Sequence, residues 1–469
     1  MPTIPRARLI CDSLVSSASA PGAVAAPASA PPPITFTEAL RFWLKLGFIS
    51  FGGPAGQIAI MHQELVERRR WISDKRFLHA LNYCMVLPGP EAQQLATYIG
   101  WLMHRAWGGI VAGALFVLPS LLILIGLSWI YIAHGDTPII AGLFYGIKPA
   151  VTAIVLQAAH RIGTRALKGT LPWVIAALSF VAIFAFQVPF PAIVLAAGLI
   201  GALHGRFSPQ SYAGGGGHGG AAKNYGAAVI DDLTPPPEHA RFTWPRVTRV
   251  LVIGALLWLL PMAALVAIWG WSHTFAQMGW FFTKAALLTF GGAYAVLPYV
   301  YQGAVESYGW LTPTQMIDGL ALGETTPGPL IMVVAFVGYV GGHVQALLGP
   351  ERAFLAGAFA ACIVTWFTFL PSFLFILGGG PLVEGTRDSL KFTAPLSAIT
   401  AAVVGVIVNL ALFFGYHVLW PQGFAGRLDW ISAAIAVAAA IALFRYKRSV
   451  MQVILGCAAA GLVLRLAGA

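Results

Sequence analysis

The sequence predicts an all-α polytopic membrane protein with two homologous, inverted-topology repeats that contain broken or re-entrant helices. The first observation is composition: the 469 residues are 58% hydrophobic and 10% charged, with a mean hydropathy of +0.77. Soluble chains are roughly 45–50% apolar and about 25% charged. Apolar runs long enough to cross a bilayer recur, for example at 108–132 and 250–270. The other two observations are an internal repeat and its loop charges.

The repeat appears when the sequence is shifted by 239 positions, which places residues 45–90 on 284–329 without a gap. The coincident residues include "FGG" at Phe51 and Phe290, and "PGP" at Pro88 and Pro327. The match resumes after a short insertion, with "LPS" at 118–120 and at 370–372. Two homologous halves are typical of secondary transporters, whose substrate site lies between the repeats. A duplicated bundle without a transport role is the alternative.

The chain divides into five parts. Residues 1–34, rich in Ala, Pro and Ser, predict a disordered tail and make a poor signal peptide. Residues 35–204 form the first repeat, and 205–246 a polar, turn-rich linker with too little apolar surface to pack. An additional transmembrane helix, 247–270, precedes the second repeat, 271–469. If each repeat crosses the membrane an even number of times, this extra crossing inverts the second copy.

The loop charges support inversion. The first copy carries five basic residues in a loop whose counterpart at 301–315 has none; they are Arg68, Arg69, Arg70, Lys75 and Arg76. By the positive-inside rule the first loop is cytoplasmic and the second faces outward. The same rule, with 161–168 interpreted as a cytoplasmic loop, favours re-entrant hairpins at the PGP segments. Broken helices that span the membrane remain the alternative.

Breaks at membrane depth are expected to bind a ligand. Proline lacks an amide hydrogen and glycine permits unusual dihedrals, and irregular backbone is tolerated only against protein or a water-filled cavity. A half-helix that restarts after a break presents free N–H groups and the positive end of its dipole, which suits an anion. The predicted binding residues at the four breaks are Gly52, Gly53, Gly89, Gln93, Gly291, Gly292, Thr325, Thr326 and Gly328.

Four ionisable residues lie near these breaks. Lys45 and Lys284 precede the two "FGG" motifs and either balance the charge of an anion or reach to the membrane interface. Glu91 is either a proton carrier or a first-turn acid on the helix dipole. Glu324 has no acidic counterpart in the first copy, which suits proton coupling. Lys148 lies inside a helix or near its end, and the sequence leaves this open.

Several function classes are excluded. The net charge of +11 comes from short loops between apolar runs, which argues against nucleic-acid binding. The cysteines at 11, 84, 362 and 457 have no metal or redox spacing, and no dinucleotide fingerprint is present. We therefore expect no cofactor, no metal and no enzymatic activity. The lipid bilayer is the expected partner, and a homodimer is compatible with the sequence.

The long string "LPGPEAQQLATYIGW" at Leu87, with "FGGP" at Phe51, "FGGAYAVLPYV" at Phe290 and "TPGP" at Thr326, resembles the chromate ion transporter family. The resemblance begins near Phe36, extends to the C-terminus and is closest to the long-chain, two-domain members. It implies export of chromate across a bacterial inner membrane, driven by the proton gradient and conferring chromate resistance. Sulfate or another small oxyanion is the alternative cargo, and a passive channel the alternative mechanism.

Overall fold

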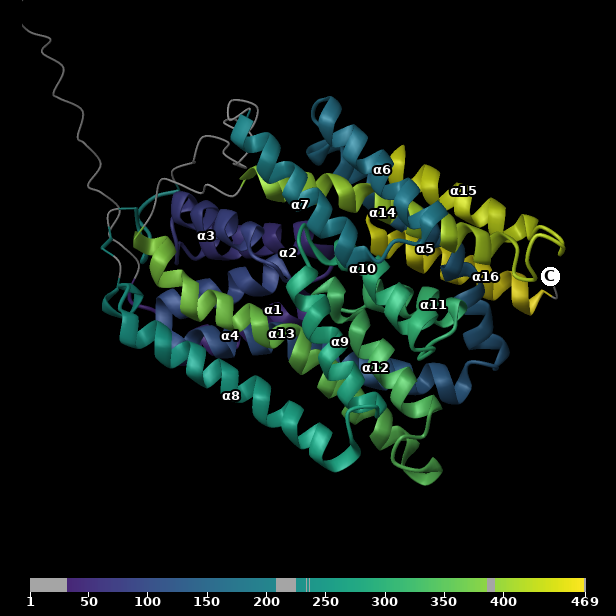
Figure 1. Ribbon diagram of the computed structural model, residues 1–469, viewed down its shortest axis with the longest axis horizontal. Coiled ribbons are helices and arrows are strands. Elements are labelled where there is room, and N and C mark those ends of the chain that lie inside the picture. Colours follow the sequence, from purple (N-terminus) through teal and green to yellow (C-terminus); the bar gives the residue numbers. More distant parts are fainter. Residues whose placement is uncertain (1–31, 208–224, 233, 236, 386–392, 468–469) are drawn as a thin grey trace, which may run out of the picture.

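The structure is a computed structural model that describes residues 32–207, 225–232, 234–235, 237–385 and 393–467. The regular secondary structure of the described residues is helical apart from one isolated bridge (Figure 1). The first half contains α1 (Phe36–Ile49), α2 (Gly53–His62), η1 (Gln63–Arg68), α3 (Asp74–Val86), α4 (Glu91–His134), α5 (Pro138–Ala166), α6 (Thr170–Phe186) and α7 (Phe190–Phe207). The short η3 (Glu238–Ala240) and the long α8 (Trp244–Trp269) follow. The second half contains α9 (Thr274–Leu288), α10 (Ala293–Tyr301), η4 (Gln302–Ser307), α11 (Pro313–Thr325), η5 (Leu330–Met332), α12 (Val333–Val344), η6 (Pro350–Arg352), α13 (Ala353–Gly385), α14 (Thr393–Leu419), α15 (Trp430–Phe444) and α16 (Val450–Leu466).

The two halves repeat the same local structure. A shift of 239 positions carries α3 onto α11, and each has 13 residues. The π-helices η1 and η4 also coincide under this shift. After each π-helix the amide of a tryptophan bonds the carbonyl six residues earlier: Trp71 to Leu65 and Trp310 to Ala304, both at 2.7 Å. The duplication predicted from the sequence is therefore also a duplication of backbone conformation.

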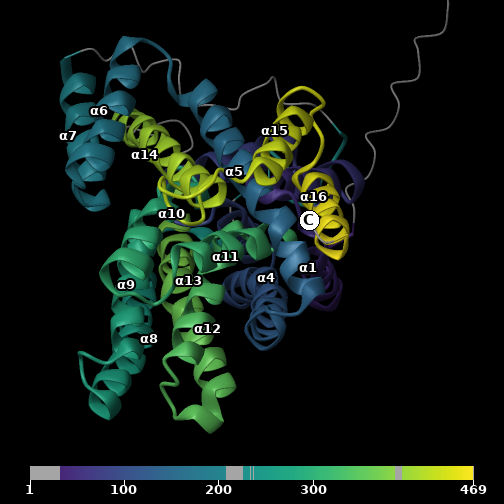
Figure 2. The ribbon, with the colours of Figure 1, turned by 90° about the vertical axis from the view of Figure 1, so that its right-hand side faces the viewer.

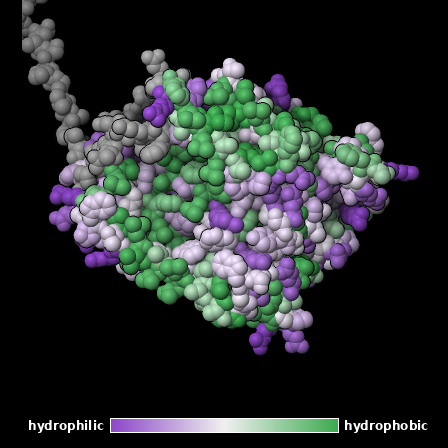
Figure 3. Space-filling view, in the orientation of Figure 1, coloured by the Kyte–Doolittle hydropathy of each residue, from purple (hydrophilic) through white to green (hydrophobic). Residues whose placement is uncertain are grey.

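Among the described residues, six helical segments are long and apolar enough to cross a membrane: α4, α5, α7, α8, residues 350–384, which comprise η6 and nearly all of α13, and α14. Apolar side chains point outward from them; on α8, for example, Leu260 is 64% exposed and Ile268 66% exposed. Figure 3 shows broad apolar areas on the exterior. Such surface is stable in lipid and rare on soluble monomers. The chain is thus an all-α, multi-pass membrane protein, as predicted.

Each PGP segment is the tip of a bent hairpin. Residues 91–103 of α4 turn back beside α3, so that the rings of Tyr83 and Tyr98 lie 5.9 Å apart. In the second half α12 returns beside α11, and Phe336 packs on Gly319. A 13-residue helix is about 20 Å long, shorter than the roughly 30 Å hydrocarbon core. The interruption predicted at each PGP segment is confirmed, and re-entrant hairpins stay the predicted arrangement in the membrane.

The homologous long helices run antiparallel. α4 reverses the chain at His104 and Arg105, which leave helical geometry, and then continues to His134. Its long part packs against α13, so that Gly109 meets Leu377 near one end while the Trp129 and Phe354 rings lie 6.3 Å apart near the other. The two views in Figures 1 and 2 also show α5 beside α14, the helices that follow α4 and α13.

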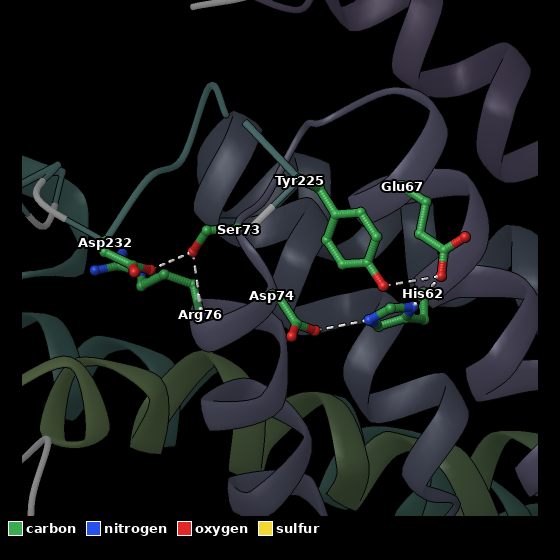
Figure 4. A network of polar contacts seen from close by, with 7 residues as sticks. All are labelled: His62, Glu67, Ser73, Asp74, Arg76, Tyr225 and Asp232. Atoms are coloured by element: carbon green, nitrogen blue, oxygen red, sulfur yellow. Dashed lines mark hydrogen bonds and ion pairs between the residues drawn. The ribbon is translucent and has the colours of Figure 1, made fainter. Parts of the chain in front are cut away.

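The described part of the linker is packed, and the prediction that 205–246 has too little apolar surface to pack was wrong for it. Ile230 is 7% exposed and pairs with Ile72 in a parallel bridge. The Ser73 hydroxyl donates to Asp232 at 2.5 Å, beside the His62 and Asp74 pair shown in Figure 4. Residues 208–224, and 1–31 of the predicted tail, lie outside the described residues.

Candidate functional site

The breaks of one repeat bind those of the other. The amide of Gly89 donates a 2.8 Å hydrogen bond to the carbonyl of Thr289, which lies just before the second "FGG". The amide of Gly328 donates a 2.8 Å bond to Ser50, just before the first "FGG". These two bonds correspond under the 239-residue shift, so a pseudo-two-fold relation connects all four breaks. The expectation that both glycine amides are free for an anion is therefore not met in this structure.

Two serines from the long helices close the packing around the PGP glycines. A Cβ on Gly89 would lie 2.4 Å from Ser372 Oγ, and one on Gly328 would lie 2.8 Å from Ser120 Cβ. The φ angles of these glycines are 127° and 101°, which other residues rarely adopt. Ser120 and Ser372 belong to the duplicated "LPS" motifs, so each half packs its "LPS" on the PGP of the other.

Three buried glutamines surround the breaks with unpaired oxygens. Gln57 donates to the carbonyls of Gly328 and Ser50, Gln94 to Pro88 at 2.8 Å, and Gln93 to Thr97 at 3.0 Å. All three are at most 1% exposed. Within the described chain, each leaves its Oε1 without a hydrogen-bond partner. Because buried polar atoms are nearly always paired, these oxygens mark a space suited to a polar ligand or water.

A cluster of charges lies beside the breaks. The Tyr294 hydroxyl donates to the Glu324 carboxylate, and the Arg161 guanidinium lies 6.0 Å from the Tyr294 ring centroid. Arg161 interacts electrostatically with Glu324, and Arg165 and Arg161 both interact with Glu91. Glu91 faces the second glycine pair, since its Oε1 would lie 3.8 Å from a Cβ on Gly292. Two carboxylates from different repeats thus share Arg161 near the end of α5, and Arg165 interacts with Glu91 as well.

The other predicted residues are distributed as follows. Gly52, Gly53, Gly291 and Gly292 all have positive φ, between 68° and 94°, and form the breaks predicted for them. Thr325 and Thr326 donate their hydroxyl protons to carbonyls of their own helix. In this conformation the two hydroxyl groups can therefore only accept hydrogen bonds from a ligand.

The two predicted lysines are not brought to the breaks. Lys45 is exposed on α1, where it lines a surface cleft with Arg41 and Arg69. Lys284 places its Nζ 5.7 Å from the centroid of the Trp280 ring. Both contacts suit an interfacial anchor, the second role considered for them.

Arg161 and Arg165 were not among the predicted site residues. The segment 161–168 was expected to be a loop, whereas both arginines occupy the last turns of α5. Lys148, left open by the sequence, lies inside α5 and pairs with Asp318 of α11 at 3.4 Å. Among the described residues, no group of three His, Cys, Asp or Glu side chains is placed to hold a metal ion.

Comparison with known proteins gives the family. Residues 37–202 and 276–462 match the family model described as chromate transporter. The chain belongs to this family. The chain is similar to a chromate transport protein of Pseudomonas aeruginosa, which is 33% identical over 442 residues, covering 92% of this chain and 93% of the relative.

Two further relatives match over nearly as much of the chain. A chromate transport protein of Cupriavidus metallidurans is 27% identical, covering 92% of this chain and 94% of the relative. A probable chromate transport protein of Synechococcus elongatus is 28% identical, covering 86% and 91%. No solved structure matches this family member. Family and apolar helices together identify a multi-pass protein of the inner membrane.

Proposed function

We propose that the protein is a secondary active transporter, not an enzyme, that exports chromate across the inner membrane and so confers chromate resistance. The relatives named chromate transport proteins support the cargo. The observation that carries the proposal is the shared charge cluster, in which Arg161 interacts electrostatically with both Glu324 and Glu91 and lies beside Tyr294, the hydrogen-bond partner of Glu324. Transporters built from repeats bind their substrate at such a junction.

The anion binds at Arg161 in this proposal. Chromate is a tetrahedral dianion, and the planar, permanently charged guanidinium can bind two oxyanion oxygens at once. Arg161 interacts electrostatically with both Glu91 and Glu324, and Arg165 interacts with Glu91. Both carboxyl groups take up protons outside after the anion has left and release them inside before the next anion binds, so protons move inward as the dianion moves outward. Gln93 and the glycine pairs at 52–53 and 291–292 complete the polar wall.

The two repeats have inverted topology in this proposal. The antiparallel course of α4 and α13, which carry the two "LPS" motifs, supports it. The basic loop at 68–76 and its uncharged counterpart at 307–315 support it independently. An inverted pair places equivalent hairpins on opposite sides of one central site, as alternating access requires.

The proton-motive force drives export. Moving two negative charges out of an inside-negative cell gains about 4.6 kcal/mol per 100 mV of membrane potential. Glu91 and Glu324 carry protons in the same cycle, because carboxyl groups at membrane depth are costly unless they are functional. Sulfate, which has the same charge and shape, is the second candidate cargo.

Transport into inverted vesicles tests the proposal. We expect radiolabelled chromate to accumulate when respiration energises the vesicles and to leak when an uncoupler is added. Arg161→Gln abolishes accumulation, whereas Lys168→Gln, an exposed control just beyond α5, leaves it intact. Accumulation that survives the uncoupler would contradict proton coupling. Tighter competition by sulfate than by unlabelled chromate would indicate sulfate as the cargo.

A further inference from the structure

Another buried carboxylate, Asp318, lies away from the breaks in the middle of α11. The side chain of Asp318 is 2% exposed. Its Oδ2 accepts a hydrogen bond from the Tyr131 hydroxyl at 2.8 Å and lies 3.4 Å from Lys148 Nζ. Its Oδ1 is also buried but has no hydrogen-bond partner among the described residues. Oδ2 of this carboxyl group is therefore paired, whereas Oδ1 has no hydrogen-bond partner within the described chain.

The surroundings of Asp318 contain few other charges. α11 packs against α4, α5, α12, α14, α16 and η5. From α4 and α5 the groups that act on Asp318 are Tyr131 and Lys148, and Asp136 acts on Tyr131 in turn. The charged or histidine side chains of α12, α14 and α16 are His343, His417 and Arg465. None of these three is hydrogen-bonded or ion-paired to Asp318.

We propose that Asp318 is a proton-binding site of the transport cycle, where a proton on the carboxyl group replaces the ion pair with Lys148 and releases α11 from α5. Lys148 is 28% exposed, so the lysine side of the pair reaches the molecular surface. The unpartnered Oδ1 is the atom that accepts the proton. The same proton leaves when the ion pair re-forms, which balances the step.

Release of α11 reaches the charge cluster directly. Glu324 is six residues further along the same helix, about 9 Å away. The second PGP break follows it at once. A proton at Asp318 therefore acts on the hairpin that holds one carboxylate of the anion site. This inference rests on the proposed function and adds a site to it.

A purely structural ion pair is the competing explanation, and a double variant separates the two. Asp318→Asn with Lys148→Gln removes both charges, so no uncompensated buried charge remains to unfold the protein. If the pair is only structural, proton-coupled transport survives in this double variant. If Asp318 binds the proton, coupling is lost, because neither asparagine nor glutamine titrates. Asp318→Glu keeps a carboxyl group and should keep the function.

The experiment uses the purified full chain in liposomes with two measurements. The first is exchange of labelled for unlabelled chromate without any gradient; the second is accumulation driven by a pH gradient while the membrane potential is clamped. We expect Asp318→Asn and the double variant to keep exchange and lose the pH-driven accumulation. Asp318→Glu and the control Glu351→Gln, at an exposed residue of η6, keep both. Wild-type pH-driven accumulation in the double variant would overturn the inference.

Labelling of the wild-type protein supplies a test that needs no variant. Carbodiimides modify buried carboxyl groups only when these carry a proton. We expect the peptide containing Asp318 to be modified in the membrane, and more at acidic than at alkaline pH. No modification of Asp318 at any pH, while other buried carboxyl groups react, would overturn the inference. Absence of chromate exchange in the wild type would instead contradict the proposed function. The labelling would then still report whether Asp318 binds a proton.

Discussion

The amide of Gly89 bonds the carbonyl of Thr289 across the two repeats, and the amide of Gly328 bonds Ser50 in the same way. Each half therefore supplies the acceptor for the broken helix of the other half. Backbone groups exposed by a break cannot be satisfied by lipid, so neither break is stable without its partner repeat. The duplication is thus a structural requirement of the site.

Alanine at either PGP glycine should disrupt this junction. Gly89→Ala and Gly328→Ala force a side chain onto a left-handed backbone and against Ser372 or Ser120. We expect a loss of about 1–3 kcal/mol in stability, together with loss of chromate transport. Thermal unfolding in detergent and vesicle uptake measure the two effects. Gly126→Ala, in open space on α4, is the control and should leave both unchanged.

The two conspicuous lysines should be dispensable for transport. Lys45 is exposed, and Lys284 contacts Trp280 rather than the breaks. We expect Lys45→Met and Lys284→Met to keep near-normal chromate uptake. The second loses only a cation–π contact of about 0.5–2 kcal/mol. If either well-folded variant lost uptake, the lysines would belong to the anion site.

The first hairpin should depend on a buried ion pair. Arg76 Nη2 lies 3.1 Å from Glu384 Oε2, and Tyr98 donates to the other oxygen of the same carboxylate. Arg76→Met leaves a buried charge and should cost about 3–5 kcal/mol. Arg76→Met with Glu384→Met should recover much of that loss. Thermal unfolding measures both, and equal loss in the double variant would contradict the assignment.

A matched control exists on the adjacent π-helix. Arg68 pairs with Glu64 at 2.6 Å, but the arginine side chain is 62% exposed. Removal of an exposed pair typically costs about 0–1 kcal/mol. We therefore expect Arg68→Met to unfold close to the wild-type temperature.

Much of the fold could be predicted from the sequence because its signals are local. The length of each apolar run predicts a membrane-spanning helix, and the "FGG" and "PGP" motifs predict where helices break. The shift that aligns Lys45 with Lys284 also aligns α3 with α11, residue for residue. The linker was harder, because three buried residues suffice to dock its described part: Ala228, Ile230 and Ala240.

The site was less predictable because its contacts are distant in the chain. Arg161 meets carboxyl groups 70 positions before it and 163 positions after it, at Glu91 and Glu324. Nothing local to "AAHRIGTRA" distinguishes the end of a helix from a cytoplasmic loop. Likewise, the hydrogen bonds made by the amides of Gly89 and Gly328 depend on how the two repeats dock. The pattern of apolar residues along the sequence does not predict that docking.

The central claim is that equivalent loops of the two repeats face opposite sides of the membrane. Arg68 and Ser307 occupy equivalent, exposed positions at the ends of η1 and η4. Arg68→Cys and Ser307→Cys, each in a chain whose four native cysteines are replaced, can be treated with a membrane-impermeant maleimide. We predict that intact cells label only Ser307→Cys and inverted vesicles only Arg68→Cys. Labelling of both positions from the same side would contradict the account.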